Sequence, residues 1–418
     1  FDLLRRHLVR RGFTVTALQN FTDIDDKILS RAREEGVPPA AIAERYIASY
    51  HDAERRLNIV PADRYPRVTE HIPDIIAAVA SLVEKGYAYV TPSGVYFDLE
   101  RFPSYGKLSG RNRRDLLVGA RVEPDETKRS PLDFAVWKSV RSGDDVSWDS
   151  PWGKGRPGWH IECSVMSMKY LGATLDLHGG GQDLIFPHHE NEVAQSEALT
   201  GKPFVRYWVH NGFVTINNQK MSKSLKNIFA LADVFGVYDP MVVRLFLISQ
   251  HYRQPLDYCD EELRQFAAVY QRFINARDAA VFALGAGGCT PGAVDDQVRV
   301  QVDGAVAAFD RAMDEDLNTS VALGALHTLV GVLNEVRGGR IGNLQYAYGA
   351  FRELLDALGI TLPDAGPIPD EIAALVARRQ TARTARNFAE ADRLRNEIAA
   401  RGYAVEDTPH GPLVRRRR

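Results

Sequence analysis

The sequence predicts an α/β fold in which helices cover a parallel sheet, followed by an all-helical region. Residues 1–12 place leucine and valine at helical spacing, and the apolar run 13–18 after them is typical of a buried strand. Residues 172–230 again alternate short strands with helices, whereas residues 240–360 repeat apolar positions three and four apart. Ligands of such α/β domains bind beyond the carboxyl ends of the strands. The segment 20–26, which follows the first expected strand, is therefore a candidate site.

A long polar segment interrupts the α/β part, and a small charged region follows the helical part. Residues 29–155 hold two helical stretches and a β-hairpin pattern, so we expect an insertion into the α/β domain. The Pro- and Gly-rich stretch 361–369 predicts a linker. After it we expect a helical hairpin over 370–401 and a short β-hairpin that begins with the strand 403–407. The stretches expected inside the insertion are helices at 40–57 and 71–85 and strands at 87–90 and 95–98.

The composition is ordinary for a soluble globular protein. The 418 residues are 45% hydrophobic and 25% charged, with a formal net charge of −2. No apolar run approaches the roughly 18 residues of a membrane span, and no signal peptide is visible. Three scattered cysteines form no disulfide framework, which favours a reducing, cytoplasmic location. The net charge excludes an overall basic surface, so binding of RNA would need local basic patches. Arg415–Arg418 is a candidate patch, although this run is equally typical of a solvated tail.

Three residues have the side chains of a metal site. His188 and Glu192 are four residues apart and share one face of a helix, and Cys163 lies upstream of them. Thiolate, imidazole and carboxylate together suit zinc, and three protein ligands leave one coordination position open for a substrate. The spacing alone also fits a buried cysteine beside an unrelated histidine.

A second candidate site is the segment Lys220–Ser224, which reads Lys-Met-Ser-Lys-Ser. Two lysines three residues apart, with serines between and after them, can neutralise and hydrogen-bond a triphosphate. The alternative is a solvated, charged turn. A full match to a specified five-residue motif is rare enough to favour the phosphate interpretation.

The segment Lys220–Ser224 resembles the second signature of class I aminoacyl-tRNA synthetases. Several further segments are similar to those of the cysteinyl members of this family, and together they cover nearly the whole chain. They are Asn20–Ile28, Asp133–Lys138, Gly158–Cys163, His178–Leu184, Phe186–Glu192 and His251–Arg253.

The resemblance implies a Rossmann-type parallel-sheet catalytic domain with a connective insertion. A stem-contact segment, an α-helical anticodon-binding bundle and a small C-terminal α/β domain follow it. The implied boundaries are 1–28 with 156–230 for the catalytic domain, whose first strand is absent, 29–155 for the insertion, 231–260 for the stem contact, 261–362 for the bundle and 370–418 for the C-terminal domain.

The implied activity is that of a cysteine–tRNA ligase. Such an enzyme activates L-cysteine with ATP and Mg²⁺ to cysteinyl-adenylate and then transfers the cysteinyl group to tRNA(Cys). One Zn²⁺ per chain, on Cys163, His188 and Glu192, would bind the substrate thiolate and prefer it over the hydroxyl of serine. We expect a cytoplasmic monomer with no membrane association and no obligatory protein partner.

The resemblance also assigns the remaining residues of the site. Lys223 would stabilise charge in the transition state with support from Lys220, and Trp159 would form a wall of the substrate pocket beside Thr22. We expect His189 to orient the metal ligands, and leave the roles of His160 and His178 open. The residues expected to bind ATP or the adenylate are Asn20, Phe21, Thr22, Gly181, Asp183, Val214, through its backbone, and Lys223.

The sequence departs from the family pattern at its start. The first signature, which contains two histidines, and the first zinc-binding cysteine are not found, and both would lie upstream of Phe1. Phe1 also opens inside a helical pattern without a capping residue, which predicts a natural start further upstream. We therefore expect residues 1–418 alone to bind zinc weakly and to form no adenylate. A smaller departure is Lys226, where the family usually has glycine.

Three alternative functions fit part of the sequence. A paralogue that joins cysteine to an amino-sugar shares the zinc site, but lacks a C-terminal domain and the full His-His-Glu-Asn-Glu run of residues 188–192. A non-catalytic RNA-binding relative would have no use for the lysines of 220–224. A zinc hydrolase would need a general base for a metal-bound water, and it leaves the same lysines unexplained.

Overall fold

The protein consists of two compact units, which are described separately. The computed structural model describes residues 1–111, 127–140, 146–216, 219–220 (backbone only), 230–285, 288–364, 366–408 and 411–416. We call residues 16–54 and 60–213 the pocket unit, and residues 1–15, 55–59 and 214–418 the bundle unit.

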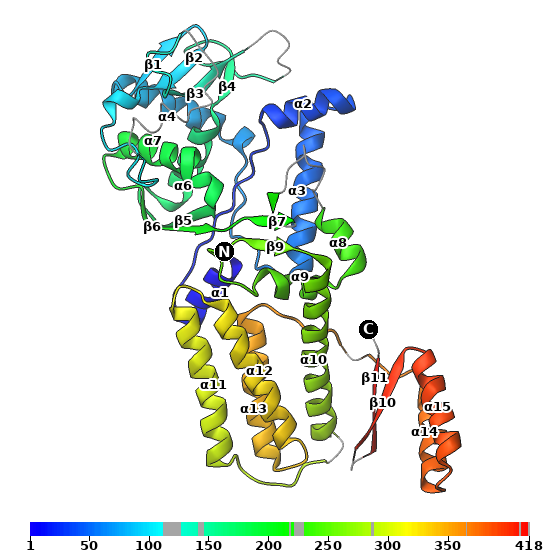
Figure 1. Cartoon of the computed structure of the whole chain (residues 1–418). Helices are drawn as coiled ribbons and strands as arrows, with labels where there is room; N and C mark the ends of the chain where they lie inside the picture. Colours follow the sequence, from blue (N-terminus) through cyan, green and yellow to red (C-terminus); the bar gives the residue numbers. More distant parts are fainter. Residues whose placement is uncertain are drawn as a thin grey trace. The chain divides into compact units, whose positions relative to one another are not determined.

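The pocket unit combines an antiparallel sheet with a parallel strand pair and several helices (Figure 1). The antiparallel sheet has the order β1-β2-β3-β4, and β5 pairs with β6 in parallel. The elements are α2 (Asp26–Glu35), α3 (Pro39–Arg56), η1 (Val68–Glu70), α4 (Ile72–Glu84), β1 (Ala88–Thr91), β2 (Gly94–Phe97), η2 (Leu99–Arg101), β3 (Phe134–Ser139), β4 (Gly155–Pro157), α6 (Trp159–Leu171), β5 (Leu175–Gly181), η3 (Gln182–Leu184), η4 (Ile185–His189), α7 (Glu190–Thr200) and β6 (Val205–Asn211).

The bundle unit begins with α1 and contains a small sheet of order β8-β7-β9, in which β7 and β9 are parallel. Helices α10–α13 run side by side in Figure 1 and are followed by the α14–α15 hairpin. The elements are α1 (Asp2–Arg10), β7 (Val214–Ile216), β8 (Gln219–Lys220), α8 (Leu231–Val237), α9 (Pro240–Leu247), β9 (Leu256–Tyr258), α10 (Asp260–Gly285), α11 (Asp296–Asp314), α12 (Thr319–Val336), α13 (Ile341–Ala357), α14 (Asp370–Thr384), α15 (Phe388–Ala400), β10 (Tyr403–Thr408) and β11 (Gly411–Arg416).

The core of the pocket unit forms where α4 and α6 pack against β1–β3. Its largest side chains, Trp137 and Phe97, are fully buried. Gly158 caps the N-terminus of α6 and lies so close to β3 that a Cβ atom would come within 1.9 Å of the Ala135 carbonyl oxygen. Only glycine allows this approach, and the packing fixes the position at which α6 begins.

Most elements expected from the sequence are confirmed. The first helix, the two helices and the hairpin within 29–155, the helical region after 240 and the C-terminal helical and β-hairpins are all present. The two parallel strand pairs, β5–β6 and β7–β9, confirm the α/β class. The turn expected at residues 409–410 lies outside the described residues.

The expected strand at 13–18 is wrong. These residues form no strand, and Phe13 is 62% exposed instead of buried. A strand needs backbone partners along its length. The segment 63–67 hydrogen-bonds this part of the chain only from Ala17 onward. It forms two isolated parallel bridges, Leu18 with Arg64 and Phe21 with Arg67, of which one falls within residues 13–18. The run is expected to be a strand because its residues are apolar, but its backbone does not make the regular hydrogen bonds of a strand.

One helix of the bundle has the length and apolarity that a membrane span also requires. By these two criteria α12 qualifies, but 56% of it is buried inside the bundle. Its buried leucines and valines pack against α11 and α13. The apolar sequence of α12 is thus explained by the core of the bundle.

Arg244 on α9 connects three segments of the bundle unit. Its side chain is 5% exposed, its Nε donates to the Leu358 carbonyl at 2.8 Å, and its Nη1 donates to the Leu57 carbonyl at 2.7 Å. Its Nη2 pairs with the Asp2 carboxylate at the start of α1. A planar guanidinium matches these three acceptors in a way that lysine cannot.

We predict that Arg244→Met lowers the free energy of unfolding by about 3–5 kcal/mol. The variant removes the buried donors of the Leu358 and Leu57 carbonyls and leaves the Asp2 carboxylate with Arg6 as its remaining cation. Urea denaturation of the variant measures the change. The matched control is Arg264→Met on the exposed face of α10, for which we expect a change within about 0.5 kcal/mol. Equal stability of the two variants would contradict the prediction.

Candidate functional site

The pocket unit brings the three expected metal ligands together. The ligand atoms of Cys163, His188 and Glu192 all lie within 4.8 Å of one another. Cys163 is on α6, His188 lies within the irregular turn η4, and Glu192 is in the first turn of α7. The Nε2 atom of His188 is 3.0 Å from Oε1 of Glu192, as expected for residues four apart on one helical face.

Residues 190–196 of α7 are all buried, although most of them are polar. Glu190 accepts hydrogen bonds from the backbone N–H groups of Gly106 at 2.9 Å and Ser109 at 2.7 Å, and Asn191 accepts one from the Tyr105 hydroxyl at 2.6 Å. Buried polar groups need such partners. The polar residues of α7 therefore fix the loop 105–109 and hold Glu192 in position.

A ring of histidines surrounds Glu192. The Nε2 atom of His178, on β5, lies 3.1 Å from Oε2 of Glu192, and the Nε2 atom of His189 lies 3.9 Å from Oε1. His210, on β6, is 2.8 Å from Nδ1 of His189. These contacts place His178 and His189 in a second group with Glu192 that has metal-ligand spacing. The role expected for His189, orienting the metal ligands, stays a prediction.

The donor set fits a zinc ion. Oε1 of Glu192 is completely buried and has no hydrogen bond of normal geometry among the described residues. A sulfur, a nitrogen and this oxygen converge within one coordination sphere, which is a mixed set that zinc accepts. Asn20 reaches the sulfur as well, with its Nδ2 atom 3.4 Å from Sγ of Cys163.

The pKa shifts of Glu192 and Cys163 also indicate that a bound cation would stabilise the cluster. Burial alone would raise the pKa of Glu192, but the charges of His178 and His188 and their hydrogen bonds outweigh burial and lower it well below its usual range. Burial, followed by the charges of Glu192 and Glu162, raises the pKa of the Cys163 thiol well above its usual value. A bound metal ion reverses that effect, because its charge favours the thiolate.

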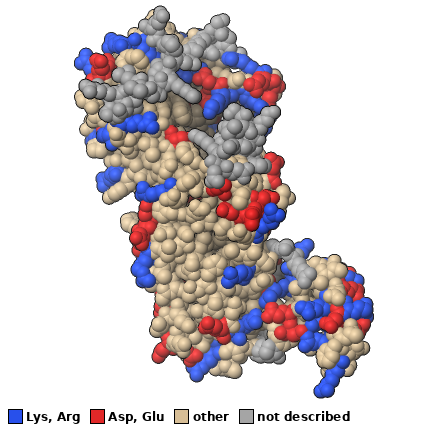
Figure 2. All heavy atoms as spheres, viewed as in Figure 1, with Lys and Arg blue, Asp and Glu red and all other residues tan. Residues whose placement is uncertain are grey.

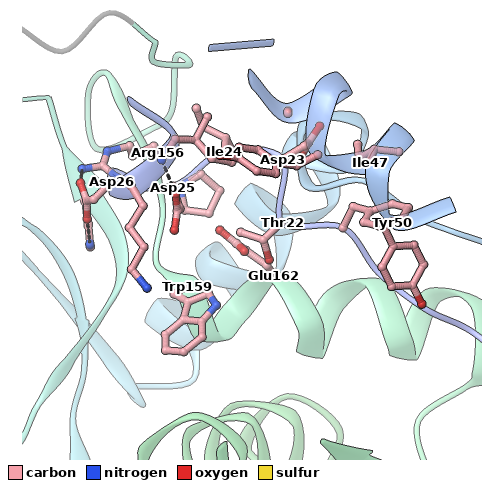
Figure 3. Close-up of a pocket in the computed structure, with 17 residues that line it drawn as sticks. Thr22, Asp23, Ile24, Asp25, Asp26, Ile47, Tyr50, Arg156, Trp159 and Glu162 are labelled. Atoms are coloured by element: carbon pink, nitrogen blue, oxygen red, sulfur yellow. Dashed lines mark hydrogen bonds and ion pairs between the residues drawn. The ribbon is translucent and has the colours of Figure 1, made fainter. Parts of the chain in front are cut away.

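A cavity of about 630 Å³ opens beside the cluster (Figure 3). Trp159 and Glu162, three residues apart on α6, line it together with Phe21 and Thr22. The ring of Trp159 also lies 4.3 Å from the ring of His188, centroid to centroid, so the metal group and the cavity share a wall. The cavity is large enough for a small-molecule ligand.

The other wall of the cavity is aromatic. The ring of Phe21 stacks on Tyr65 at 5.6 Å and meets Tyr50 edge to face at 5.2 Å. Tyr65 donates its hydroxyl to the buried Glu54 carboxylate at 2.6 Å, and His51 contacts the other oxygen of Glu54 at 3.0 Å. Burial and this hydrogen bond raise the pKa of Tyr65 to about 12. The hydrogen bonds of Glu54 thus fix the ring against which Phe21 packs.

The charges at one end of the cavity are paired. Asp26 lies 3.0 Å from Nζ of Lys138 and also pairs with Arg156. Burial alone would raise the pKa of Asp26, and the two cations lower it. Glu162 is different: burial, with help from Asp23, raises its pKa well above the usual value.

The structure places the remaining expected site residues in several positions. Gly181 and Asp183 are adjacent at the end of β5, where a Cβ on Gly181 would meet Oδ1 of Asp183 at 2.4 Å, but neither lines the cavity. Asn20 contacts Cys163 instead of the cavity. Val214 belongs to β7 in the bundle unit.

The two expected phosphate-binding lysines are not tested by the structure. Lys220 is in β8, where only the backbone is described, and Lys223 lies outside the described residues.

Sequence reasoning missed three residues of the site. Glu162 and Arg156 line the cavity, and His210 contacts the histidine ring. A signal for Glu162 was present, because it is a lone carboxylate in the otherwise apolar first part of α6 and lies three residues after Trp159. His210 lies within β6, two residues after Trp208, and nothing in its spacing points to His189.

Comparisons with known proteins agree with this geometry. The structure of Mycobacterium tuberculosis methionyl-tRNA synthetase in complex with methionyl-adenylate superimposes with a TM-score of 0.66 at 17% identity, over 85% of this chain and 86% of that chain. A ternary LeuRS-tRNA-LeuAMS complex from Agrobacterium radiobacter gives 0.64 at 11% identity, over 86% and 80% of the two chains. The family model for the class I (C) tRNA synthetase catalytic domain matches residues 1–268. The chain has the fold of a class I aminoacyl-tRNA synthetase.

Curated relatives specify the family. The cysteine–tRNA ligase of Caldicellulosiruptor saccharolyticus is 47% identical over 100% of this chain and 90% of its own length. That of Geobacter sulfurreducens is 45% identical over 98% of this chain and 89% of its own length. The chain belongs to the cysteine–tRNA ligase family.

Two further family models match the C-terminal half. A DALR domain covers residues 308–362, and a cysteinyl-tRNA ligase anticodon binding domain covers residues 365–415. The description "anticodon binding" therefore falls on the α14–α15 hairpin and β10–β11. The sequence analysis identified this region only as a small C-terminal domain.

We predict that the metal-free protein loses stability as the pH falls below 6.5. Burial lowers the pKa of both His160 and His189 to about 3, so only the unfolded chain takes up these protons between pH 6.5 and pH 3. Each histidine then contributes up to about 1.4 kcal/mol per pH unit. Urea midpoints of chelator-treated protein at pH 7, 6 and 5 measure the slope. We expect a smaller slope for His160→Asn, and an unchanged slope would contradict the assignment.

Proposed function

We propose that the protein is a cysteine–tRNA ligase that activates L-cysteine with ATP and transfers it to tRNA(Cys). The observation that carries the proposal is the convergence of Cys163, His188 and Glu192 beside a cavity that the same helix, α6, lines with Trp159 and Glu162. A thiol ligand in this cavity can reach the metal group. Membership of the cysteine–tRNA ligase family supports the same substrate.

Zn²⁺ on Cys163, His188 and Glu192 would supply a soft coordination position that binds a thiolate and disfavours a hydroxyl. The protein residues hold the ion and orient the substrate. Glu192 keeps its negative charge through His178 and His188, and Asn20 donates toward the sulfur of Cys163. A site that recognises the sulfur directly rejects serine without an editing step.

Adenylate formation would use the residues expected from the family. Phe21, Thr22 and Trp159 lie in the cavity, where they can contact the amino acid or the adenylate. Lys220 and Lys223 would neutralise the charge that develops on the ATP phosphates, together with Mg²⁺. We assign the contacts with the ribose and adenine to Gly181, Asp183 and the backbone of Val214.

The domain boundaries and the partners belong to the same proposal. We propose residues 1–28 and 156–230 for the catalytic domain, 29–155 for the insertion and 231–260 for the stem contact. The bundle 261–362 and the domain 370–418 would contact tRNA. The visible face of the α14–α15 hairpin carries both charge signs interspersed, so recognition there needs more than bulk positive charge (Figure 2). We propose a cytoplasmic monomer.

The paralogue that joins cysteine to an amino-sugar is the second candidate. The match of residues 365–415 to a cysteinyl-tRNA ligase anticodon binding domain favours the ligase, because the paralogue lacks a C-terminal domain.

The test of function is exchange of pyrophosphate into ATP by the natural full-length protein. We expect exchange that depends on cysteine and exceeds the serine-dependent rate by roughly 10⁴-fold, because the site recognises the sulfur itself. A charging assay with tRNA(Cys), run beside an amino-sugar ligation assay, separates the two candidates. Exchange without charging would contradict the ligase.

The test of the metal site is Cys163→Ser. We predict a loss of zinc affinity of more than about a hundredfold, since even partners outside the ligand set change affinity by 10- to 100-fold. Competition with a coloured zinc chelator measures it. Cys259→Ser is the control, because that cysteine lies at the start of α10 in the bundle unit, and we expect its zinc affinity to equal the wild-type value.

A further inference from the structure

We propose that Glu162 is the residue that binds the α-ammonium group of the amino acid substrate. The inference rests on the proposed function, because it takes a thiol-containing amino acid as the occupant of the cavity. It adds a second recognition point to the site, distinct from the metal ligands.

Glu162 is a buried residue at the edge of the cavity, and one of its carboxylate oxygens lacks a hydrogen-bond donor among the described residues. The residue is 2% exposed, yet it lines the cavity, and its carboxylate lies beside Thr22 in Figure 3. The Thr22 hydroxyl donates one hydrogen bond to this carboxylate. Its Oε2 atom has no hydrogen-bond partner in the described part of the chain. A buried carboxylate oxygen without a donor is unfavourable unless a ligand supplies one.

The other carboxylates that line the cavity already have protein partners. Asp23 accepts hydrogen bonds from the backbone N–H and the hydroxyl of Thr69, at 3.1 and 2.5 Å. Asp25 caps α2 by accepting from the Ile28 N–H at 2.7 Å. Asp26 pairs with Lys138 and Arg156. Among the described carboxylates that line the cavity, Glu162 is the one with a buried oxygen that has no hydrogen-bond partner.

The position of Glu162 on α6 suits a small amino acid. It immediately precedes the metal-group residue Cys163 and lies one helical turn after Trp159. In cysteine the thiol and the ammonium are separated by only two carbon atoms. A ligand whose sulfur lies at the Cys163 group can therefore direct its ammonium toward Glu162.

An ammonium group also has the right chemistry for this carboxylate. It carries a positive charge and three N–H donors, so it can both neutralise Glu162 and fill the open position at Oε2. A thiol without an amine, or one whose amine is acylated, leaves that oxygen unpaired. The contact thus restricts the site to free amino acids, whereas the metal group selects for sulfur.

The experiment is calorimetric titration of the zinc-loaded, natural full-length protein with cysteine and with 3-mercaptopropionate, which lacks the amine. We expect wild-type protein to bind cysteine roughly ten- to a hundredfold more tightly. Glu162→Gln should raise the Kd for cysteine by a similar factor and leave the Kd for 3-mercaptopropionate unchanged. Glu162→Asp retains the charge at shorter reach and should show an intermediate preference.

The control is Asp133→Asn, which alters a buried carboxylate outside the cavity that accepts from Tyr89, Leu99 and Ser130. It should lower stability and leave the ratio of the two Kd values unchanged. A Glu162→Gln protein that keeps the wild-type ratio, or wild-type protein that binds both thiols equally, would overturn the inference. Failure of the proposed function is read separately, as absence of cysteine-dependent pyrophosphate exchange by wild-type protein.

Discussion

The buried charge of Glu192 is the constraint on which the site depends. Its side chain is 1% exposed, and a carboxylate in such surroundings is unstable unless cations or strong donors face it. His178 and His188 supply these contacts from β5 and η4, and His210 on β6 holds His189 beside them. The parallel pair β5–β6 and the turn before α7 are therefore fixed around one carboxylate. A metal ion at its open oxygen would complete the arrangement.

Helix α6 links this metal group to the cavity. Successive residues of a helix point about 100° apart, so Glu162 and Cys163 face different directions from one backbone position. Glu162 and Trp159 line the cavity, whereas Cys163 belongs to the metal group and Ser164 hydrogen-bonds with Gln195 of α7 at 3.1 Å. Because Gly158 fixes where α6 begins, the two groups keep a constant separation. A rigid element of this kind suits a ligand that must be held at two atoms.

The sequence predicts the helices of this protein well and its site in part. Helical periodicity identifies α4 and α11–α13 because their apolar faces pack on a core. It cannot show that residues 13–16 have no neighbouring strand, because composition carries no information on which segment lies beside them. Residue type and spacing suggest the metal group and the family resemblance favours it, whereas the role of Glu162 depends on the tertiary position of Thr22 and on an oxygen without a described partner. A carboxylate oxygen without a hydrogen-bond partner can be identified only in the folded structure.

The distribution of unsatisfied groups separates structural carboxylates from functional ones. Asp23, Asp133 and Glu190 are buried like Glu162, but each accepts at least one hydrogen bond from a backbone N–H group of a neighbouring segment. Their burial stabilises the fold. Among the described buried carboxylates, Glu162 has an oxygen with no hydrogen-bond partner, and Glu192 has an oxygen whose nearest partners are the imidazoles of His188 and His189. Both residues lie on the helix pair α6–α7. Native proteins leave few such groups, and they concentrate where a ligand completes them. Under the proposals above, the sulfur and the ammonium of one amino acid would bind beside these two oxygens, so two buried carboxylates whose burial costs the fold stability would make the site selective.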